Sequence, residues 1–241
     1  MSSQKKQSTF ARKQKEQKRK LSNYLKRSAI KRSVKEVGGI GLPSKMPGYA
    51  YGLSAELCGT GGKLRGVIGS VCEGCYAMGS NYAYPSVKKA HEARLESLGN
   101  LEKWVDNMGT IMDYLGSVLP DEERCWRWHD SGDLQGITHL HAIVQVAIRN
   151  PGWRFWIPTK EYAIVRKYTE EHAIPGNLAV RMSAPMLNKA CPGALKELTG
   201  LYSTVGHDEE QRCPAYDQEG FCGTCRKCWD SSEACTDYPK H

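Results

Sequence analysis

The feature that most constrains the fold is an alternation of strand-like and helix-like segments in the middle of the chain. Short runs rich in aromatic and β-branched residues are separated by stretches with apolar residues three and four apart. The sequence predicts strands over 124–129, 153–157, 178–182 and 202–205, with helices over 137–149, 161–172 and 194–199. Alternating strands and helices form parallel βαβ units, so we expect an α/β protein. A partial or full (β/α) barrel is the expected architecture, and an open doubly wound sheet is the alternative.

The first 36 residues differ from the rest of the chain in charge. They contain thirteen Lys or Arg and two Glu, whereas the remaining residues carry a net charge of −3 within the total of +8. This segment has few large apolar residues, which predicts a disordered basic arm over 1–36 and a single α/β domain over 37–241. Basic runs neutralise phosphates, so the arm predicts a nucleic-acid partner. The alternative is a solvated tail that aids solubility.

Composition indicates a cytoplasmic protein, expected in a bacterial host cytoplasm. The chain is 40% hydrophobic, has no apolar run of membrane-spanning length, and lacks the apolar segment of a secretory signal after its charged N-terminus. It contains ten cysteines. Because disulfides do not persist in a reducing compartment, clustered cysteines are expected to be ligands or catalytic groups.

The cysteine spacing predicts a metal centre. Near the C-terminus the pattern C-x8-C-x2-C-x2-C brings four thiols together, and an earlier Gly-rich segment carries C-x13-C-x2-C. The seven candidate ligands are Cys58, Cys72, Cys75, Cys213, Cys222, Cys225 and Cys228. Two-residue gaps are typical of [4Fe–4S] clusters, which we favour. Zinc is the alternative metal, with Cys72/Cys75 and Cys225/Cys228 as two knuckles.

The number of clusters stays open at this point. A cluster held by the three early cysteines leaves one iron free for a ligand, which suggests S-adenosylmethionine radical chemistry, although the compact C-x3-C-x2-C signature is absent. A single cluster built from both ends of the chain is equally compatible with the spacing. Cys125 is expected to be a core residue, and Cys191 and Cys235 receive no role.

Polar residues follow three successive predicted strands. The candidate catalytic residues are His129, Asp130, Ser131, Asp133 and Lys160, and the candidate ligand-binding residues are Arg181 and Ser183. Because active sites of (β/α) folds form at the carboxyl ends of strands, we expect a polar pocket there for a small anionic ligand. A hydrolase would use His129 as base, helped by Asp130 or Asp133, with Ser131 as nucleophile. Each residue taken alone is more often a helix cap or surface group, and the recurrence at three strand ends favours a pocket.

In this order, the landmarks resemble a family of phage and prophage proteins, the gene product 88 family, presumed to be iron–sulfur proteins. The matching segments are 45–49, 71–77, 127–134, 155–161, 180–183 and 222–229. The resemblance covers residue 40 to the C-terminus and leaves the basic arm outside. It implies a cubane iron–sulfur cluster, a barrel akin to radical S-adenosylmethionine enzymes, and an association with weak ester hydrolysis. The ligands that it implies are Cys72, Cys75, Cys222, Cys225 and Cys228, with Cys58 and Cys213 as further members.

Overall fold

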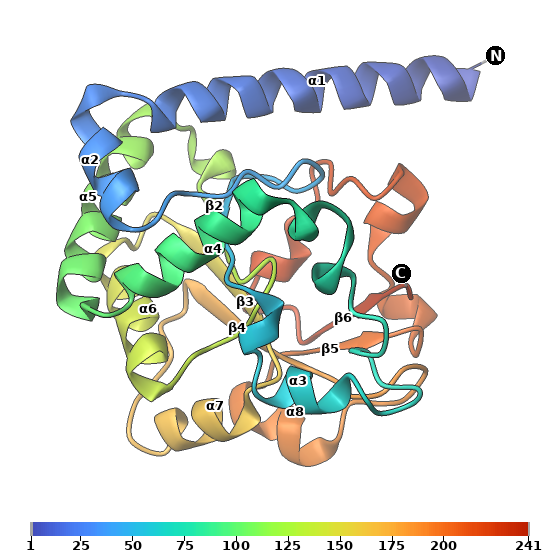
Figure 1. The fold of residues 1–241 in the computed structure, drawn as a ribbon. Helices are drawn as coiled ribbons and strands as arrows, with labels where there is room; N and C mark the ends of the chain where they lie inside the picture. Colours follow the sequence, from blue (N-terminus) through green and yellow to red (C-terminus); the bar gives the residue numbers. More distant parts are fainter. Residues whose placement is uncertain (1, 241) are drawn as a thin grey trace.

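The centre of the molecule is a parallel six-stranded sheet. The structure, a computed structural model, describes residues 2–240, with side chains from residue 11 onward. The strands are β1 (Tyr49–Tyr51), β2 (Cys125–Trp128), β3 (Arg154–Thr159), β4 (Leu178–Ser183), β5 (Tyr202–Val205) and β6 (Cys235–Tyr238). Their order in the sheet is the order in the chain, and every neighbouring pair is parallel (Figure 1).

Helices fill the connections between the strands. The α-helices are α1 (Ser2–Leu25), α2 (Ser28–Glu36), α3 (Thr60–Leu64), α4 (Pro85–Ser97), α5 (Leu101–Val118), α6 (Ile137–Arg149), α7 (Tyr162–Thr169) and α8 (Gly193–Thr199). Short 3₁₀ helices are η1 (Ala55–Leu57), η2 (Tyr76–Met78), η3 (Ser80–Ala83), η4 (Asp121–Glu123), η5 (Glu209–Gln211), η6 (Pro214–Gln218) and η7 (Lys227–Trp229). α4 and α5 are separate helices, and the Asn100 side chain caps α5 by accepting from the Lys103 N–H.

The strand order decides between the two expected architectures. A doubly wound sheet reverses its strand order at a switch point, and the order β1 to β6 contains no reversal. The α/β class and the parallel sheet are therefore confirmed, and the doubly wound alternative is wrong. Within residues 2–240 the edge strands β1 and β6 do not pair with each other, so a closed barrel is not observed.

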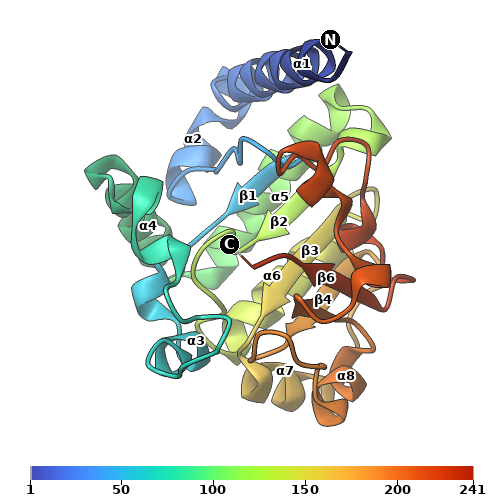
Figure 2. The same cartoon turned by 90° about the vertical axis from the view of Figure 1, so that its right-hand side faces the viewer.

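The two faces of the sheet have different coverings. Trp128, Phe155 and Val180 point toward α5, α6, α7 and α8, and they form the main hydrophobic core with those helices. The opposite face, which we call the inner face, carries Arg127 and Trp156 and is covered by the C-terminal segment (Figure 2). This arrangement follows from the alternation of side chains along each strand.

Two strands were not predicted. The four expected strands are confirmed as β2 to β5, whereas β1 and β6 lie outside them. β1 has three residues and lies in a Gly-rich stretch, and β6 has the mixed sequence Cys-Thr-Asp-Tyr. Neither gives a periodic apolar signal, and pairing with β2 and β5 forms them.

The basic arm packs onto the body in this structure. Leu21 and Ile30 of the arm are buried in the main core, as is Val37 directly after it. Lys18 Nζ donates to the Gly48 carbonyl at 2.9 Å, and α1 lies across one end of the body (Figure 1). The expectation of a disordered arm therefore fails for the docked part of α1 and for α2, because their apolar residues find partners in α5 and β1. None of the helices within residues 2–240 is long and apolar enough to cross a membrane.

Candidate functional site

The predicted cysteine ligands form two separate groups. Cys58, Cys72 and Cys75 lie in the connection from β1 to β2, and we call them the trio. Cys213, Cys222, Cys225 and Cys228 lie in the connection from β5 to β6, and we call them the quartet. Neighbouring candidate thiols shift the pKa of several of these cysteines. In each case the neighbours belong to the same group as the cysteine that they affect. The trio and the quartet therefore belong to different connections of the sheet and interact within themselves.

The trio segment crosses the carboxyl ends of the strands. Val71 N–H donates to the carbonyl of Pro185 after β4, and Thr60 N–H donates to Glu161 Oε1 after β3 at 2.8 Å. Gly61 lies against Cys58 and Cys72, and a Cβ at this position would approach Cys72 Sγ to 3.5 Å. Glycine thus allows the two cysteines to approach the α3 backbone closely.

Burial makes the trio thiols poor acids. It raises the pKa of Cys58 to about 12, with further contributions from Asp133 and the other two thiols. Burial also raises the pKa of Cys72, and the charge of Lys160 partly offsets this effect. A bound metal would supply the positive charge that thiolates need here.

Asp133 is a structural anchor between β2 and β3. One carboxylate oxygen accepts from Thr159 Oγ1 at 2.6 Å and from Leu134 N–H at 2.8 Å, and the other accepts from Lys160 N–H at 2.8 Å. Burial raises the pKa of Asp133 to about 6 despite these bonds. The side chain therefore fixes the strand ends beneath the trio.

His129 lies on the helix side of the sheet. Its ring packs against His139 of α6 at 5.3 Å between centroids, and both ring nitrogens are buried without a hydrogen-bond partner in the described structure. Burial, followed by the charges of His139 and Arg127, holds the pKa of His129 well below its ordinary value. The residue also has a φ of +57°, which is strained for a side chain with a Cβ.

Ser131 is paired with a histidine that sequence reasoning missed. Its Oγ lies 3.2 Å from Nε2 of His91 on α4 and donates to the Leu53 carbonyl at 2.7 Å. No hydrogen bond joins Ser131 to His129 within the described residues. His91 precedes Ser131 by forty residues, so spacing alone gave no signal for this pair.

Asp130 is held by aromatic residues of the trio segment. Its carbonyl accepts from the hydroxyls of Tyr76 and Tyr82 at 2.9 Å and 3.4 Å. Its Oδ1 is buried and has no hydrogen-bond partner among the described residues. The backbone of Asp130 therefore links the end of β2 to the segment that carries the trio.

The quartet lies at the inner face. Cys228 packs with Trp156 and Trp229, and its Sγ lies 3.0 Å from the Tyr238 hydroxyl. Burial raises the pKa of Cys228 to about 12 and that of Cys222 to about 11, and neighbouring thiols raise both further. Cys125, expected to be a core residue, is confirmed as one in this same cluster.

Cations surround the quartet. Arg127 and Arg226 lower the pKa of Cys222, and Lys18 of α1 interacts with the same thiol. Arg181 and Lys227 act in the same direction on Cys228 and Cys213, respectively. Five basic side chains thus interact with Cys213, Cys222 and Cys228, an environment that favours a negatively charged group.

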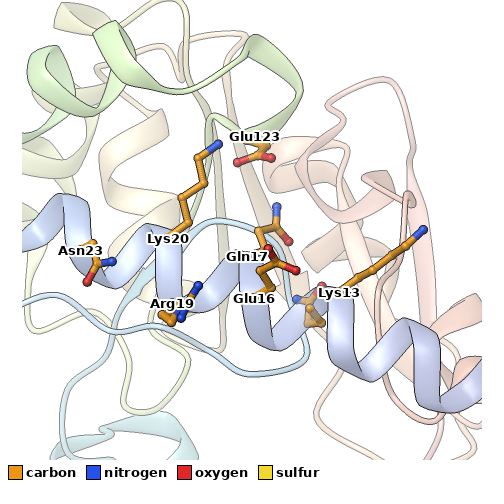
Figure 3. A pocket seen from close by; sticks show the side chains of 8 residues that line it. Lys13, Glu16, Gln17, Arg19, Lys20, Asn23 and Glu123 are labelled. Atoms are coloured by element: carbon orange, nitrogen blue, oxygen red, sulfur yellow. The ribbon is translucent and has the colours of Figure 1, made fainter.

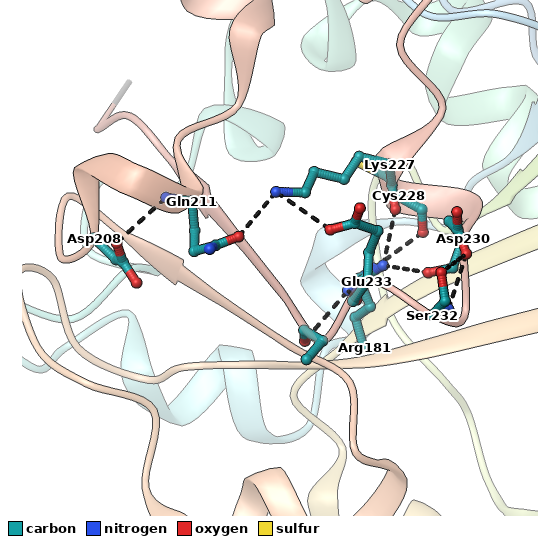
Figure 4. Close-up of polar contacts among 9 residues, drawn as sticks. Arg181, Asp208, Gln211, Lys227, Cys228, Asp230, Ser232 and Glu233 are labelled. Carbon is teal, nitrogen blue, oxygen red and sulfur yellow. Dashed lines mark hydrogen bonds and ion pairs between the residues drawn. The ribbon is translucent and has the colours of Figure 1, made fainter.

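Arg181 forms its hydrogen bonds with backbone carbonyls of the protein. Its guanidinium is fully buried and donates to the carbonyls of Lys227, Cys228, Asp230 and Glu233 at 2.7–3.0 Å (Figure 4). It therefore fastens η7 and the quartet segment to β4. Ser183, the other predicted ligand-binding residue, lies half-buried at the end of β4, and its carbonyl accepts from Tyr162 Oη at 2.5 Å.

A cavity of about 620 Å³ lies elsewhere, between α1 and the turn before β2. Gln17 and Lys20 of α1 face Glu123 across it (Figure 3). The cavity contains neither the thiol groups nor the polar strand ends. Among the described residues, no group of three or more His, Cys, Asp or Glu is placed closely enough to hold a metal ion. The case for a metal in this protein therefore rests on the chemistry of the seven candidate thiols and on the charged side chains near them.

Comparison with known proteins gives one match. The family model described as gene product 88 matches residues 5–231. No curated protein and no solved structure matches the chain. The match begins within the basic arm, so the expectation that the family likeness starts near residue 40 is wrong. The match covers nearly the whole chain and supports the expectation of a phage protein; the chain belongs to the gene product 88 family.

Proposed function

We propose that this protein binds a [4Fe–4S] cluster through Cys213, Cys222, Cys225 and Cys228. The observation that carries the proposal is that these four cysteines share one connection of the sheet and that basic side chains interact with Cys213, Cys222 and Cys228. A cubane cluster with four thiolates is an anion, so nearby cations stabilise it and raise its reduction potential. When bound, the cluster would supply either structural cross-linking or one-electron transfer.

The chain's own residues prepare this site. Arg181 holds the backbone on both sides of Cys228, and Tyr238 orients its sulfur from β6. Gly220 and Gly223 have φ values of +83° and +56°, which let the backbone turn sharply between the ligands. Lys18 of α1 contributes a positive charge that interacts with Cys222.

The trio supports a second candidate function, a radical S-adenosylmethionine-like enzyme. Its three thiols follow β1 and lie over the carboxyl ends of β2 to β4, where pockets of (β/α) folds form. Three cysteine ligands leave one iron of a cubane cluster open to a small molecule. We also infer that the sequential sheet is a partial barrel, because parallel strands in chain order curve in one direction through their common twist.

Anaerobic purification followed by measurement of iron, sulfide, zinc and visible absorbance tests the proposal. We expect iron and sulfide in cubane proportion, with Cys225→Ala removing the quartet's share and Cys75→Ala removing the trio's share. Cys191→Ala is the matched control, because this buried cysteine belongs to neither group. A colourless protein with stoichiometric zinc would establish the zinc alternative instead.

A further inference from the structure

We infer that Arg127 on β2 binds the carboxylate of a small-molecule ligand at the inner face of the sheet. The inference rests on the proposed function, whose anionic ligand it specifies. It also moves the ligand-binding cation from Arg181, where the sequence placed it, to a different strand.

The two arginines of the inner face differ in their partners. Arg181 is saturated by backbone carbonyls. Arg127 donates Nη1 to Met46 Sδ at 2.9 Å, and its guanidinium lies 4.6 Å from the Trp156 ring centroid. Its Nε is buried without a hydrogen-bond partner among the described residues. A thioether and an aromatic ring are weak compensation for a guanidinium withdrawn from water.

The charge of Arg127 is also unpaired at short range. None of the ion pairs within the described part of the chain involves Arg127, and Asp130 interacts with it only over a longer distance. A buried cation is normally matched by a carboxylate with good geometry. No carboxylate of the described residues makes this close contact, and we infer that a ligand carboxylate supplies it.

The surrounding donors fit an organic carboxylate. A guanidinium offers two parallel N–H groups, which match the two oxygens of a carboxylate. Trp156 Nε1 and Thr236 Oγ1 are further inner-face atoms that are buried without a partner in the described structure, although their residues are 5% and 1% exposed. They can pair with polar atoms of the ligand. Asp130 contributes a negative charge near Arg127, which disfavours a phosphate dianion relative to a monoanion.

The inner face is partly exposed at the level of Arg127. Arg127, Pro158, Ser183 and Tyr238 are half-buried, whereas Trp156, Arg181 and Thr236 on the same face are buried. Tyr76, which is 48% exposed, lies close enough to Arg127 to affect its pKa. We therefore place the ligand on the Arg127 side of this face.

The test measures thermal unfolding of the anaerobically purified, metal-loaded protein in sodium acetate, sodium benzoate or inorganic phosphate at ionic strength matched with sodium chloride. A ligand that binds the native state raises the melting temperature in a saturable way. We expect benzoate or acetate to do so for the wild type and for Arg166→Gln, which changes an exposed arginine on α7. Arg127→Gln should abolish the rise, and Arg127→Lys, which keeps the charge without the paired N–H groups, should retain a small part of it.

Three outcomes overturn the inference: no carboxylate-specific rise in the wild type, an equal rise in Arg127→Gln, or a larger rise with phosphate than with either carboxylate. Iron and sulfide are measured on the same samples. If the wild type lacks iron but shows an Arg127-dependent rise, the cluster proposal fails and the carboxylate site stands. If iron is present and the melting temperature does not rise with a carboxylate, the carboxylate site fails and the cluster proposal stands.

Discussion

Ser131 Oγ lies 3.2 Å from His91 Nε2, whereas His129, two residues before Ser131, packs its ring against His139. An imidazole can activate a nearby hydroxyl as a nucleophile, and here this requires Ser131 to release the Leu53 carbonyl, to which it donates its proton. Any ester turnover that uses Ser131 is therefore expected to depend on His91. We expect His91→Gln to lower it about 100-fold or more, measured with a chromogenic ester, and His129→Gln to leave kcat within a few-fold of the wild type. Loss of turnover in His129→Gln alone, with an unchanged melting curve, would restore the histidine that the sequence suggested.

Arg181→Met is expected to loosen the C-terminal segment. The change leaves four buried carbonyls without their donor, so the free energy of unfolding should fall by about 3 kcal/mol in urea denaturation. Limited proteolysis should cut first within 206–234, the segment that Arg181 fastens. Arg166→Met on the outer face of α7 serves as the control and should change neither measurement. Uncut protein with wild-type stability would show that the guanidinium contributes little.

The pH dependence of stability is expected to carry a contribution from His139. Burial lowers its pKa to about 4, so between about pH 4 and 6.5 the unfolded chain binds a proton that the native protein does not. Stability from this residue therefore increases as the pH rises through that window, by up to about 3 kcal/mol in total. Asp133 acts oppositely, because its raised pKa of about 6 makes stability fall from about pH 4 to 6.

Comparing the wild type with His139→Gln separates these two contributions. Urea denaturation at a series of pH values should show a smaller increase with pH for the variant. Parallel curves for the two proteins would mean that His139 titrates normally in the native state.

The exposed basic side chains of α1 are expected to supply any affinity for nucleic acid. They are Arg12, Lys13, Lys15, Arg19 and Lys20. Replacing all five with Gln should weaken binding to duplex DNA and flatten the dependence of log K on log salt by about 0.9 for each phosphate that the protein no longer neutralises. Melting temperature should stay near the wild-type value, because Lys18 and Leu21 still dock the helix. If the variant binds duplex DNA as tightly as the wild type, α1 contributes to the stability of the fold and not to DNA binding.

The sequence predicted the parts of the fold that have strong local signals. β2 to β5 are dense in aromatic and branched residues, so their apolar runs and intervening helices were recognisable. β1 and β6 owe their extended form to neighbours distant in sequence. The docking of Leu21 and Ile30 was missed for the same reason, since a few apolar residues in a basic segment become core only when α5 and β1 are in place.

Cysteine spacing and the alternation of strands and helices predicted part of the candidate site. Spacing identified both thiol groups, and the position of polar residues after β2, β3 and β4 identified the edge where the trio segment lies. Spacing could not distinguish Arg127 from Arg181, because both face the same side and only the later segment 227–233 supplies the carbonyls that occupy Arg181. His91 belongs to an unrelated helix, and only the folded chain brings it to Ser131.

The quartet occupies a single connection whose two ends are fixed by the neighbouring strands β5 and β6. Cys213 N–H donates to the Asp237 carbonyl on β6, and Cys228 meets Tyr238 of the same strand. The last strand must therefore add to the sheet before the four sulfurs can gather. If the quartet binds a cluster as proposed, metal insertion has to follow the pairing of β6 with β5, and a chain without β6 should fail to acquire the cluster.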